Sequence, residues 1–247
     1  MNRHVDNSRS HEVLEASALP PAFLKVAAGE FKGLMADYLL LKGVAFLGGR
    51  HETTERDINT IHTLFQQSLA LDPYFLQTCY YIQAYLVWHG KNYEEDIELL
   101  KISKNHRTWD WLPAFFIGFD YHYFLRDNLK AATYLMEASK KPGASPFLAN
   151  LAARLSQRGG QTEAAIAFLK SMRLQTKDDK VKEQFDKRIR ALEGVKLLEK
   201  GIAQYKAKFN HHPQSLDDLV TSGILSGLPE NPYKKPFVLE DDGGIEF

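Results

Sequence analysis

The chain has a single cysteine, Cys79, among its 247 residues. One cysteine excludes a disulfide within the chain and a cluster of thiolate metal ligands. Cys79 follows Thr78 and precedes Tyr80 and Tyr81, and no basic residue next to it in the sequence would activate its thiol. It is therefore interpreted as a small buried side chain, and it leaves the redox compartment open.

The chain also lacks an excess of charge of either sign. Its 31 basic and 31 acidic side chains cancel, while 44% of the residues are hydrophobic and 25% are charged. This composition is typical of a soluble globular protein. A balanced charge gives no electrostatic reason to bind a polyanion, so we expect no nucleic-acid partner.

Long hydrophobic runs are missing as well. The most apolar window, 31–47, is interrupted by Lys32, Asp37 and Lys42, so it is interpreted as part of a buried helix that extends from Phe23. Residues 1–19 carry five charged side chains and no apolar core, so we expect a disordered N-terminal segment without a secretion signal. The sequence predicts no membrane span. The alternative that an N-terminal anchor has been removed stays open.

Motifs of catalysis and of cofactor binding are missing too. The nine histidines are scattered, and none has the spacing of a metal site. Glycine pairs at 48–49 and 159–160 are not followed by the Lys-Ser/Thr of a phosphate-binding loop. We therefore expect no metal, no cofactor and no catalytic residue.

Three carboxylates need separate consideration. Asp37 and Asp120 lie within apolar helices, where burial could raise a pKa enough for catalysis. Pairing with a neighbour such as Lys42 or Arg126 is the favoured interpretation, and a hydrolase stays an alternative. Asp96 follows two glutamates at a predicted helix start, and it is interpreted as part of a solvated face.

A repeat is the most informative feature of the chain. Four similar segments place Ile61, Asp96, Ala132 and Ala165 at equivalent positions, separated by 35, 36 and 33 residues. A period of about 34 indicates a repeated helix–turn–helix unit, which must stack on its neighbours to bury its apolar face. The helices predicted after the first one cover 57–71, 74–88, 93–103, 111–125, 129–140, 147–157 and 162–174.

The C-terminal part has a different pattern. Apolar residues at steps of three or four predict one long connecting helix over 177–209. Beyond it, residues 210–247 form an α+β tail, with a short helix at 216–220, a strand at 236–239 and a hairpin turn at 242–244.

The repeats resemble tetratricopeptide repeats over roughly 34–175. The matching residues are the small side chains Ala132 and Ala165, the turn glycines Gly90 and Gly160, the apolar residues Phe65, Leu100, Met136 and Leu169, and the terminal Pro73. Ile61 and Asp96 depart from the pattern, because a small residue is expected there. The resemblance implies an α–α superhelix over 20–176, with a concave face that takes a protein or a peptide.

The tail is similar to the C-terminal part of the major pseudopilin of type II secretion. The resemblance rests on Tyr205, Phe209, Pro213, Leu216, Leu219, Val220, Gly223, Leu225, the Leu228-Pro229 and Asn231-Pro232-Tyr233 runs, Pro236-Phe237 and Gly243-Gly244. It implies a bacterial envelope protein in the periplasm or on a membrane facing it, with the cytoplasm as the alternative. It also suggests that Asp241 and Asp242 bind calcium; the alternative is that they form a solvated acidic turn.

Together these patterns predict a mostly α protein that acts as a non-catalytic scaffold for protein–protein interaction in a bacterial envelope complex. A pilin-like structural subunit is the alternative. The dense aromatic residues at 109–124 are interpreted as packing within the repeat core and against the neighbouring helix. The alternative is that tyrosines of two repeats line a groove, because tyrosine provides contact area at a low entropy cost. The predicted partner-binding residues are Tyr81, Tyr85, Trp88, Tyr121, His122 and Arg154.

Overall fold

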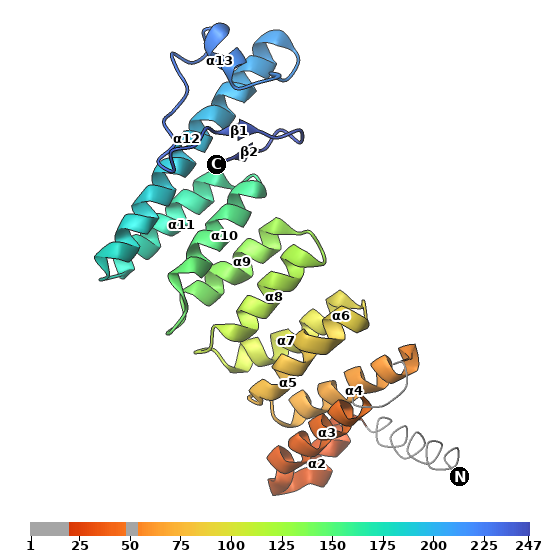
Figure 1. Cartoon of the computed structure of the whole chain (residues 1–247). Coiled ribbons are helices and arrows are strands. Elements are labelled where there is room, and N and C mark those ends of the chain that lie inside the picture. The colour runs from red at the N-terminus through yellow and green to blue at the C-terminus, as the bar shows by residue number, and fades with distance from the viewer. Residues whose placement is uncertain (1–19, 48–53) are drawn as a thin grey trace. The chain divides into compact units, whose positions relative to one another are not determined.

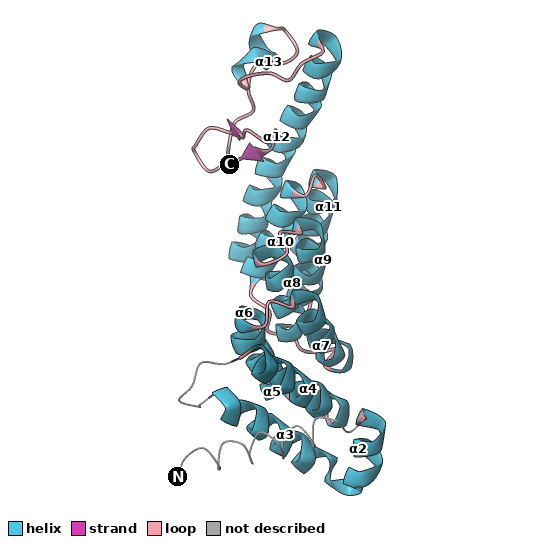
Figure 2. Ribbon diagram, turned by 90° about the vertical axis from the view of Figure 1, so that its right-hand side faces the viewer, coloured by secondary structure: helices cyan, strands magenta, loops and turns pink. Residues whose placement is uncertain are grey.

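The computed structural model describes residues 20–47 and 54–247, so the predicted disordered segment at 1–19 lies outside the described residues. The described chain is mostly helical, with a small two-stranded sheet near its C-terminal end (Figures 1 and 2). It divides into a first unit up to Leu125 and a second unit from Arg126. Within the described residues, every helix is too short or too polar to cross a bilayer.

The first unit consists of helices that pack on their neighbours in the sequence. They are α2 (Pro21–Ala28), the 3₁₀ turn η1 (Gly29–Phe31), α3 (Lys32–Leu47), α4 (Glu55–Leu71), α5 (Leu76–Tyr81), the π-helical segment η2 (Ile82–Leu86), α6 (Val87–His89), α7 (Tyr93–His106) and α8 (Leu112–Tyr123). The prediction of one buried helix from Phe23 to Leu47 is wrong in two respects: the segment is interrupted, and Leu34, Tyr38 and Leu41 of α3 are each more than half exposed. The chain breaks at Gly29, whose φ of 49° is a conformation that glycine adopts more readily than other residues.

Helix α4 lies at the centre of this unit. Thr54 and Asp57 form a capping box at its start, with the Thr54 hydroxyl accepting from the Asp57 backbone N–H and the Asp57 carboxylate accepting from that of Thr54. The helix ends at Leu71, two residues before Pro73. It packs against α2, α3, η2 and α7. Contact with α3 is close at Gly43, where an added Cβ would lie 2.6 Å from the Phe65 ring.

The four equivalent repeat positions are all buried. Ile61, Asp96, Ala132 and Ala165 are each at most 3% exposed, which confirms that the period marks the packed faces of the helices. The interpretation of Asp96 as solvated is therefore wrong. Its carboxylate occupies the position where the repeat pattern expects a small apolar residue. The position in the repeat therefore predicts its burial better than the two glutamates that precede it.

The second unit consists of α9 (Asn128–Ser139), α10 (Pro146–Arg158), α11 (Thr162–Gln175), α12 (Asp179–Phe209), α13 (Asp217–Thr221) and the antiparallel strands β1 (Val238–Leu239) and β2 (Ile245–Glu246). Helices α9 to α12 pack in sequential order (Figure 1). Helix α12 is 31 residues long. The Asp178 carboxylate accepts from two backbone N–H groups at the start of α12, and Asn210 ends the helix in the left-handed conformation.

The C-terminal tail packs along the second half of α12. Val195, Leu198 and Ile202 of α12 share a buried cluster with α13 and the hairpin. Two glycines of α12 allow the close approach, because an added Cβ would lie 2.8 Å from the Phe237 ring at Gly194 and 3.2 Å from Leu219 at Gly201. The predicted short helix and β-hairpin are thus confirmed.

Candidate functional site

Two neighbouring helices of the first unit present aromatic rings to solvent. Tyr80 and Trp88 lie on the continuous run α5–η2–α6, and Tyr123 ends α8; each is close to half exposed. We call these three side chains the aromatic face. Their rings connect the two helices, since Tyr80 lies 5.7 Å from Phe116 and Trp88 lies 5.4 Å from Tyr123, measured between centroids.

The π-helical segment η2 shapes this surface. A π-turn inserts an extra residue into a helix and often occurs at functional sites. The ring of Tyr85, within η2, stacks on the ring of His89 in α6 at 4.1 Å, and the Nδ1 atom of His89 lies 2.9 Å from the Tyr85 carbonyl oxygen. The ring of Trp88 also packs edge-on against Phe124 at 5.0 Å, so the exposed indole is held in one place.

Five of the six predicted partner-binding residues lie on these two helices. Tyr81, Tyr85 and Trp88 belong to α5–η2–α6, and Tyr121 and His122 belong to α8. Trp88 offers the largest exposed fraction of the five, whereas Tyr121 is buried. Tyr81, Tyr85 and His122 are half-buried.

Sequence reasoning missed the other two members of the aromatic face. Tyr80 lies eight residues before Trp88, and this spacing places both on one side of a helix. The spacing could have placed Tyr80 on the same side as Trp88, although it does not show that Tyr80 is exposed. Tyr123 stacks on Phe119 at 5.4 Å, and nearly half of its side chain stays exposed.

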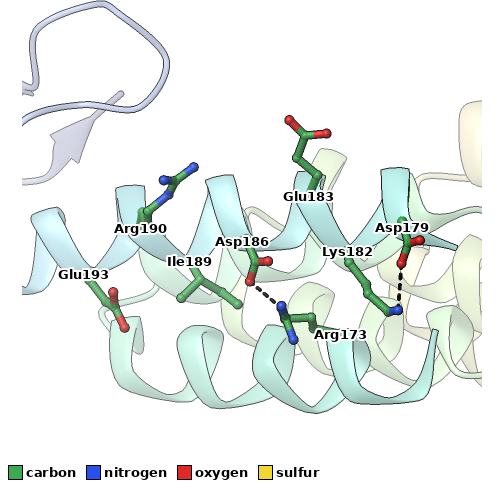
Figure 3. Close-up of a pocket in the computed structure, with 8 residues that line it drawn as sticks. All are labelled: Arg173, Asp179, Lys182, Glu183, Asp186, Ile189, Arg190 and Glu193. Carbon is green, nitrogen blue, oxygen red and sulfur yellow. Dashed lines mark hydrogen bonds and ion pairs between the residues drawn. The ribbon is translucent and has the colours of Figure 1, made fainter. Parts of the chain in front are cut away.

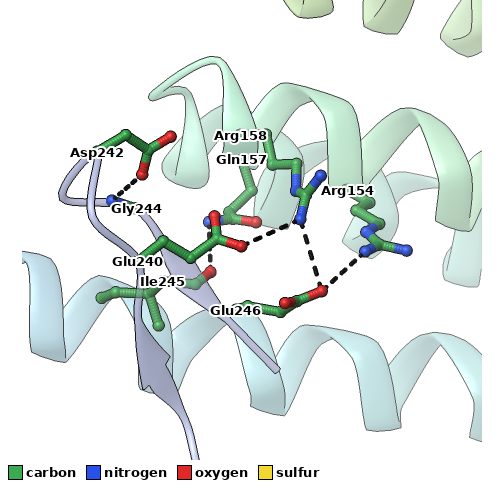
Figure 4. Close-up of polar contacts among 8 residues, drawn as sticks. All are labelled: Arg154, Gln157, Arg158, Glu240, Asp242, Gly244, Ile245 and Glu246. Atoms are coloured by element: carbon green, nitrogen blue, oxygen red, sulfur yellow. Dashed lines mark hydrogen bonds and ion pairs between the residues drawn. The ribbon is translucent and has the colours of Figure 1, made fainter.

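Arg154, the sixth predicted residue, lies on α10 in the second unit. Its guanidinium is 3.1 Å from the Glu246 carboxylate, and Arg158 reaches Glu240 and Glu246 at 3.5 Å (Figure 4). Gln157 donates from its side-chain amide to the Ile245 carbonyl oxygen at 3.1 Å. Arg154 therefore helps to fix the C-terminal hairpin on α10.

Side chains of η2, α7 and α8 form a buried polar cluster in the first unit. Asp120 of α8 is 0% exposed, and one of its carboxylate oxygens accepts a 2.8 Å hydrogen bond from the Gln83 amide on η2. Asp96 of α7 is 2% exposed. The second carboxylate oxygen of each aspartate has no hydrogen-bond partner among the described residues.

Burial changes the acidity of this cluster. Loss of solvation, reinforced by the charge of Glu95, raises the pKa of Asp96 to about 7. Burial also raises the pKa of Asp120 to about 7; the hydrogen bond from Gln83 opposes the change and the charge of Asp96 adds to it. Burial lowers the pKa of His62 on α4, which favours its neutral form, although the nearby Glu95 acts in the opposite direction.

A charged groove of about 590 Å³ lies between α11 and α12 (Figure 3). Its walls carry both signs of charge. Arg173 forms an ion pair with Asp186, and Lys182 lies 2.9 Å from Asp179. Because these groups largely neutralise one another, the groove presents no strong field to a charged ligand.

Metal-binding geometry is not found in the described parts of the chain. No group of three or more His, Cys, Asp or Glu side chains there is arranged to hold an ion. At the hairpin turn, the carboxylate of Asp242 accepts from the backbone N–H of Gly244 at 2.8 Å (Figure 4). One carboxylate oxygen of Asp242, which with Asp241 was considered for calcium binding, is therefore already engaged in a hydrogen bond.

Comparisons with protein-family models, with curated proteins and with solved structures find no match to this chain. The likeness to tetratricopeptide repeats and to the pseudopilin tail therefore rests on the sequence pattern alone.

Proposed function

We propose that the protein is a non-catalytic scaffold that binds a protein or peptide partner through the aromatic face of its first unit. The observation that carries the proposal is the joint exposure of Tyr80, Trp88 and Tyr123 on two helices that are connected by ring contacts. Tyrosine and tryptophan are enriched in the centres of protein interfaces, where a few such side chains provide most of the binding energy.

The arrangement of the rings favours binding without a large conformational change. Trp88 contacts both Tyr123 and Phe124, so its side chain is already ordered and loses little entropy on binding. In the superhelix implied by the tetratricopeptide resemblance, α5–η2–α6 and α8 are the first helices of successive pairs. A partner segment would then lie across both helices in the concave face.

The envelope location is the second part of the proposal. It rests on the resemblance of the tail to a pseudopilin, together with the packing of that tail on a single long helix, α12. In this proposal the scaffold assembles or stabilises a bacterial envelope complex in the periplasm.

The test compares two exposed tryptophans of the first unit. Trp88→Ala and Tyr123→Ala change the aromatic face, and Trp109→Ala removes an equally exposed indole that stacks on Tyr74 elsewhere in the unit. Each variant is used to recover partners from envelope extracts of the producing organism, with quantification by mass spectrometry. We expect the first two to lose the same partner proteins by about tenfold or more, while Trp109→Ala retains them. Equal recovery by all three variants would contradict the proposal.

A pilin-like structural subunit is the second candidate. The favouring observation is that α13 and the hairpin bury their apolar side chains on α12, as a globular tail on a long helix would. Filament formation by the purified chain, observed by electron microscopy, would support this candidate.

The hydrolase alternative is less favoured. Asp120 has the raised pKa that a general acid needs. However, it is completely buried between helices, so a substrate could reach it only if α8 separated from its neighbours.

A further inference from the structure

Helix α3 is apolar on two opposite sides. Its inner side, Ala36, Leu39, Leu40 and Gly43, is buried, and Ala36 and Leu39 belong to the same core cluster as Leu64 of α4. The outer side carries a row of large apolar side chains that are between 51% and 71% exposed. They are Phe31, at the end of η1, and Leu34, Tyr38 and Leu41. We call these four residues the outer stripe.

The outer stripe has the spacing of a helix-pairing surface. Its members follow one another at intervals of three, four and three residues, and the small Ala45 continues the series four residues later. This is the a/d pattern of a heptad repeat. A surface helix normally presents polar residues on its outer side, and a contiguous exposed apolar row marks an interaction site.

We propose that the outer stripe pairs with the same stripe of a second copy of this chain, with the two α3 helices parallel. The inference goes beyond the proposed function, because it uses a different surface of the first unit. Parallel pairing in register brings each ring or leucine of one stripe against its equivalent on the other helix.

The charges beside the stripe favour the parallel orientation. Asp37 and Lys42 flank the stripe on opposite sides, at heptad positions g and e. In a parallel pair, Asp37 of one copy lies opposite Lys42 of the other, twice by symmetry. In an antiparallel pair, Asp37 would face an acidic side chain, either Asp37 or Glu30 of the second copy. Lys42 already lies along the stripe, with its amine 5.2 Å from the centre of the Tyr38 ring.

The exposed area of the stripe suits a reversible dimer. With about 100 Å² exposed on each of the four side chains of the outer stripe, each copy would bury roughly 400 Å² and the pair about 800 Å², which is in the range of small, transient interfaces. The helices are already folded in each copy, so two heptads suffice without the cost of helix nucleation.

Sedimentation equilibrium of the full chain over a concentration series tests the proposal. We expect a monomer–dimer equilibrium, and Leu34→Glu weakens association on the order of 100-fold, because it places two carboxylates in the apolar contact. Leu174→Glu, at an exposed leucine of α11, serves as the matched control and leaves the equilibrium unchanged. Helical circular dichroism and tryptophan fluorescence confirm that both variants fold.

Two further variants test the orientation. Tyr38→Cys should form a disulfide between copies under mild oxidation, because equivalent a positions meet only in a parallel pair. The native Cys79 is buried, and burial raises the pKa of its thiol to about 11, so it does not compete. Asp37→Lys should weaken the dimer, and adding Lys42→Asp should restore it.

Several outcomes would overturn the proposal. One is a chain that stays monomeric at every concentration; another is a dimer that is insensitive to Leu34→Glu. Binding of the monomer to vesicles of neutral phospholipid, abolished by the same substitution, would assign the stripe to a lipid surface instead. Dimers that resist cross-linking at Tyr38→Cys and ignore the charge exchange would show an antiparallel arrangement, which contradicts the assigned geometry.

Discussion

Replacement of Asp120 by asparagine should stabilise the first unit, and increasingly so as the pH rises. The folded carboxyl has a pKa of about 7, against an ordinary 3.8. The folded state therefore binds the proton more tightly than the unfolded chain does. Stability due to Asp120 is complete below pH 4, falls between pH 4 and 7, and stays low above pH 7. Asparagine removes this cost and can still accept the amide hydrogen bond from Gln83.

The magnitude follows from the two pKa values. At 1.36 kcal/mol per unit of pH, ionisation of a carboxyl in this position costs about 4 kcal/mol at pH 8 and about 2 kcal/mol at pH 5. The advantage of Asp120→Asn over the wild type should therefore grow by about 2–3 kcal/mol from pH 5 to pH 8. Ionised Asp96 lies close enough to raise the pKa of Asp120, so the substitution also relieves repulsion between the two carboxylates.

Urea denaturation followed by tryptophan fluorescence measures this difference. All three tryptophans, Trp88, Trp109 and Trp111, belong to the first unit, so the signal reports on that unit alone. His62 acts in the opposite direction, because its lowered pKa means that stability falls as the pH drops below 6.5. The comparison of variant with wild type at each pH removes this contribution.

Glu94→Gln provides the control, since Glu94 is an exposed acid on the same helix as Asp96. Its effect should be within about 0.5 kcal/mol at every pH. An Asp120→Asn advantage that stays constant from pH 5 to pH 8 would refute the reasoning, as would a variant that is less stable than wild type at pH 8. Either result would mean that Asp120 is ionised at little cost in the folded state.

Two further substitutions, one of them with a control, test the packing. Gly194→Ala on α12 should loosen the C-terminal tail, because the new methyl group would lie 2.8 Å from the Phe237 ring. We expect a net loss of about 1 kcal/mol of stability after the gain in helix propensity, together with faster proteolysis of the tail. The control, Gly33→Ala, adds its methyl group in open space on α3 and should raise the melting temperature. Ser68→Ala should cost about 1–2 kcal/mol in urea denaturation, because the buried Ser68 hydroxyl donates to the Ala36 carbonyl oxygen at 3.0 Å. No change in the first case, or a neutral Ser68→Ala, would contradict the geometry.

Much of the secondary structure could be predicted from local patterns. The predicted helix from 162 to 174 corresponds to Thr162–Gln175, and the long helix predicted from 177 corresponds to Asp179–Phe209. Caps, prolines and glycines act within a few residues of where they stand, so their effect can be inferred without a fold. The helix break at Gly29 could not be predicted, because a glycine within an apolar run does not by itself indicate a positive φ.

The candidate site was less predictable. The sequence placed five of the proposed contact residues on two helices, and the structure confirms that they lie there. Exposure could not be inferred, because adjacent rings on one helix, such as Tyr80 and Tyr81, differ in what covers them. Arg154 shows the same difficulty. Its partner, Glu246, is 92 residues away in the chain, and no local pattern indicates that contact.

The sequence by itself determined the repeat register, the helical class and the hairpin at the end of the chain, because these depend on periodicity and on local backbone preferences. Only the tertiary structure decided which faces of the helices are covered. It buried the carboxylates of Asp96 and Asp120 and left the outer stripe of α3 open to solvent. Solvation depends on neighbours that are distant in the sequence, and the pKa changes and candidate contacts of this protein follow from that solvation.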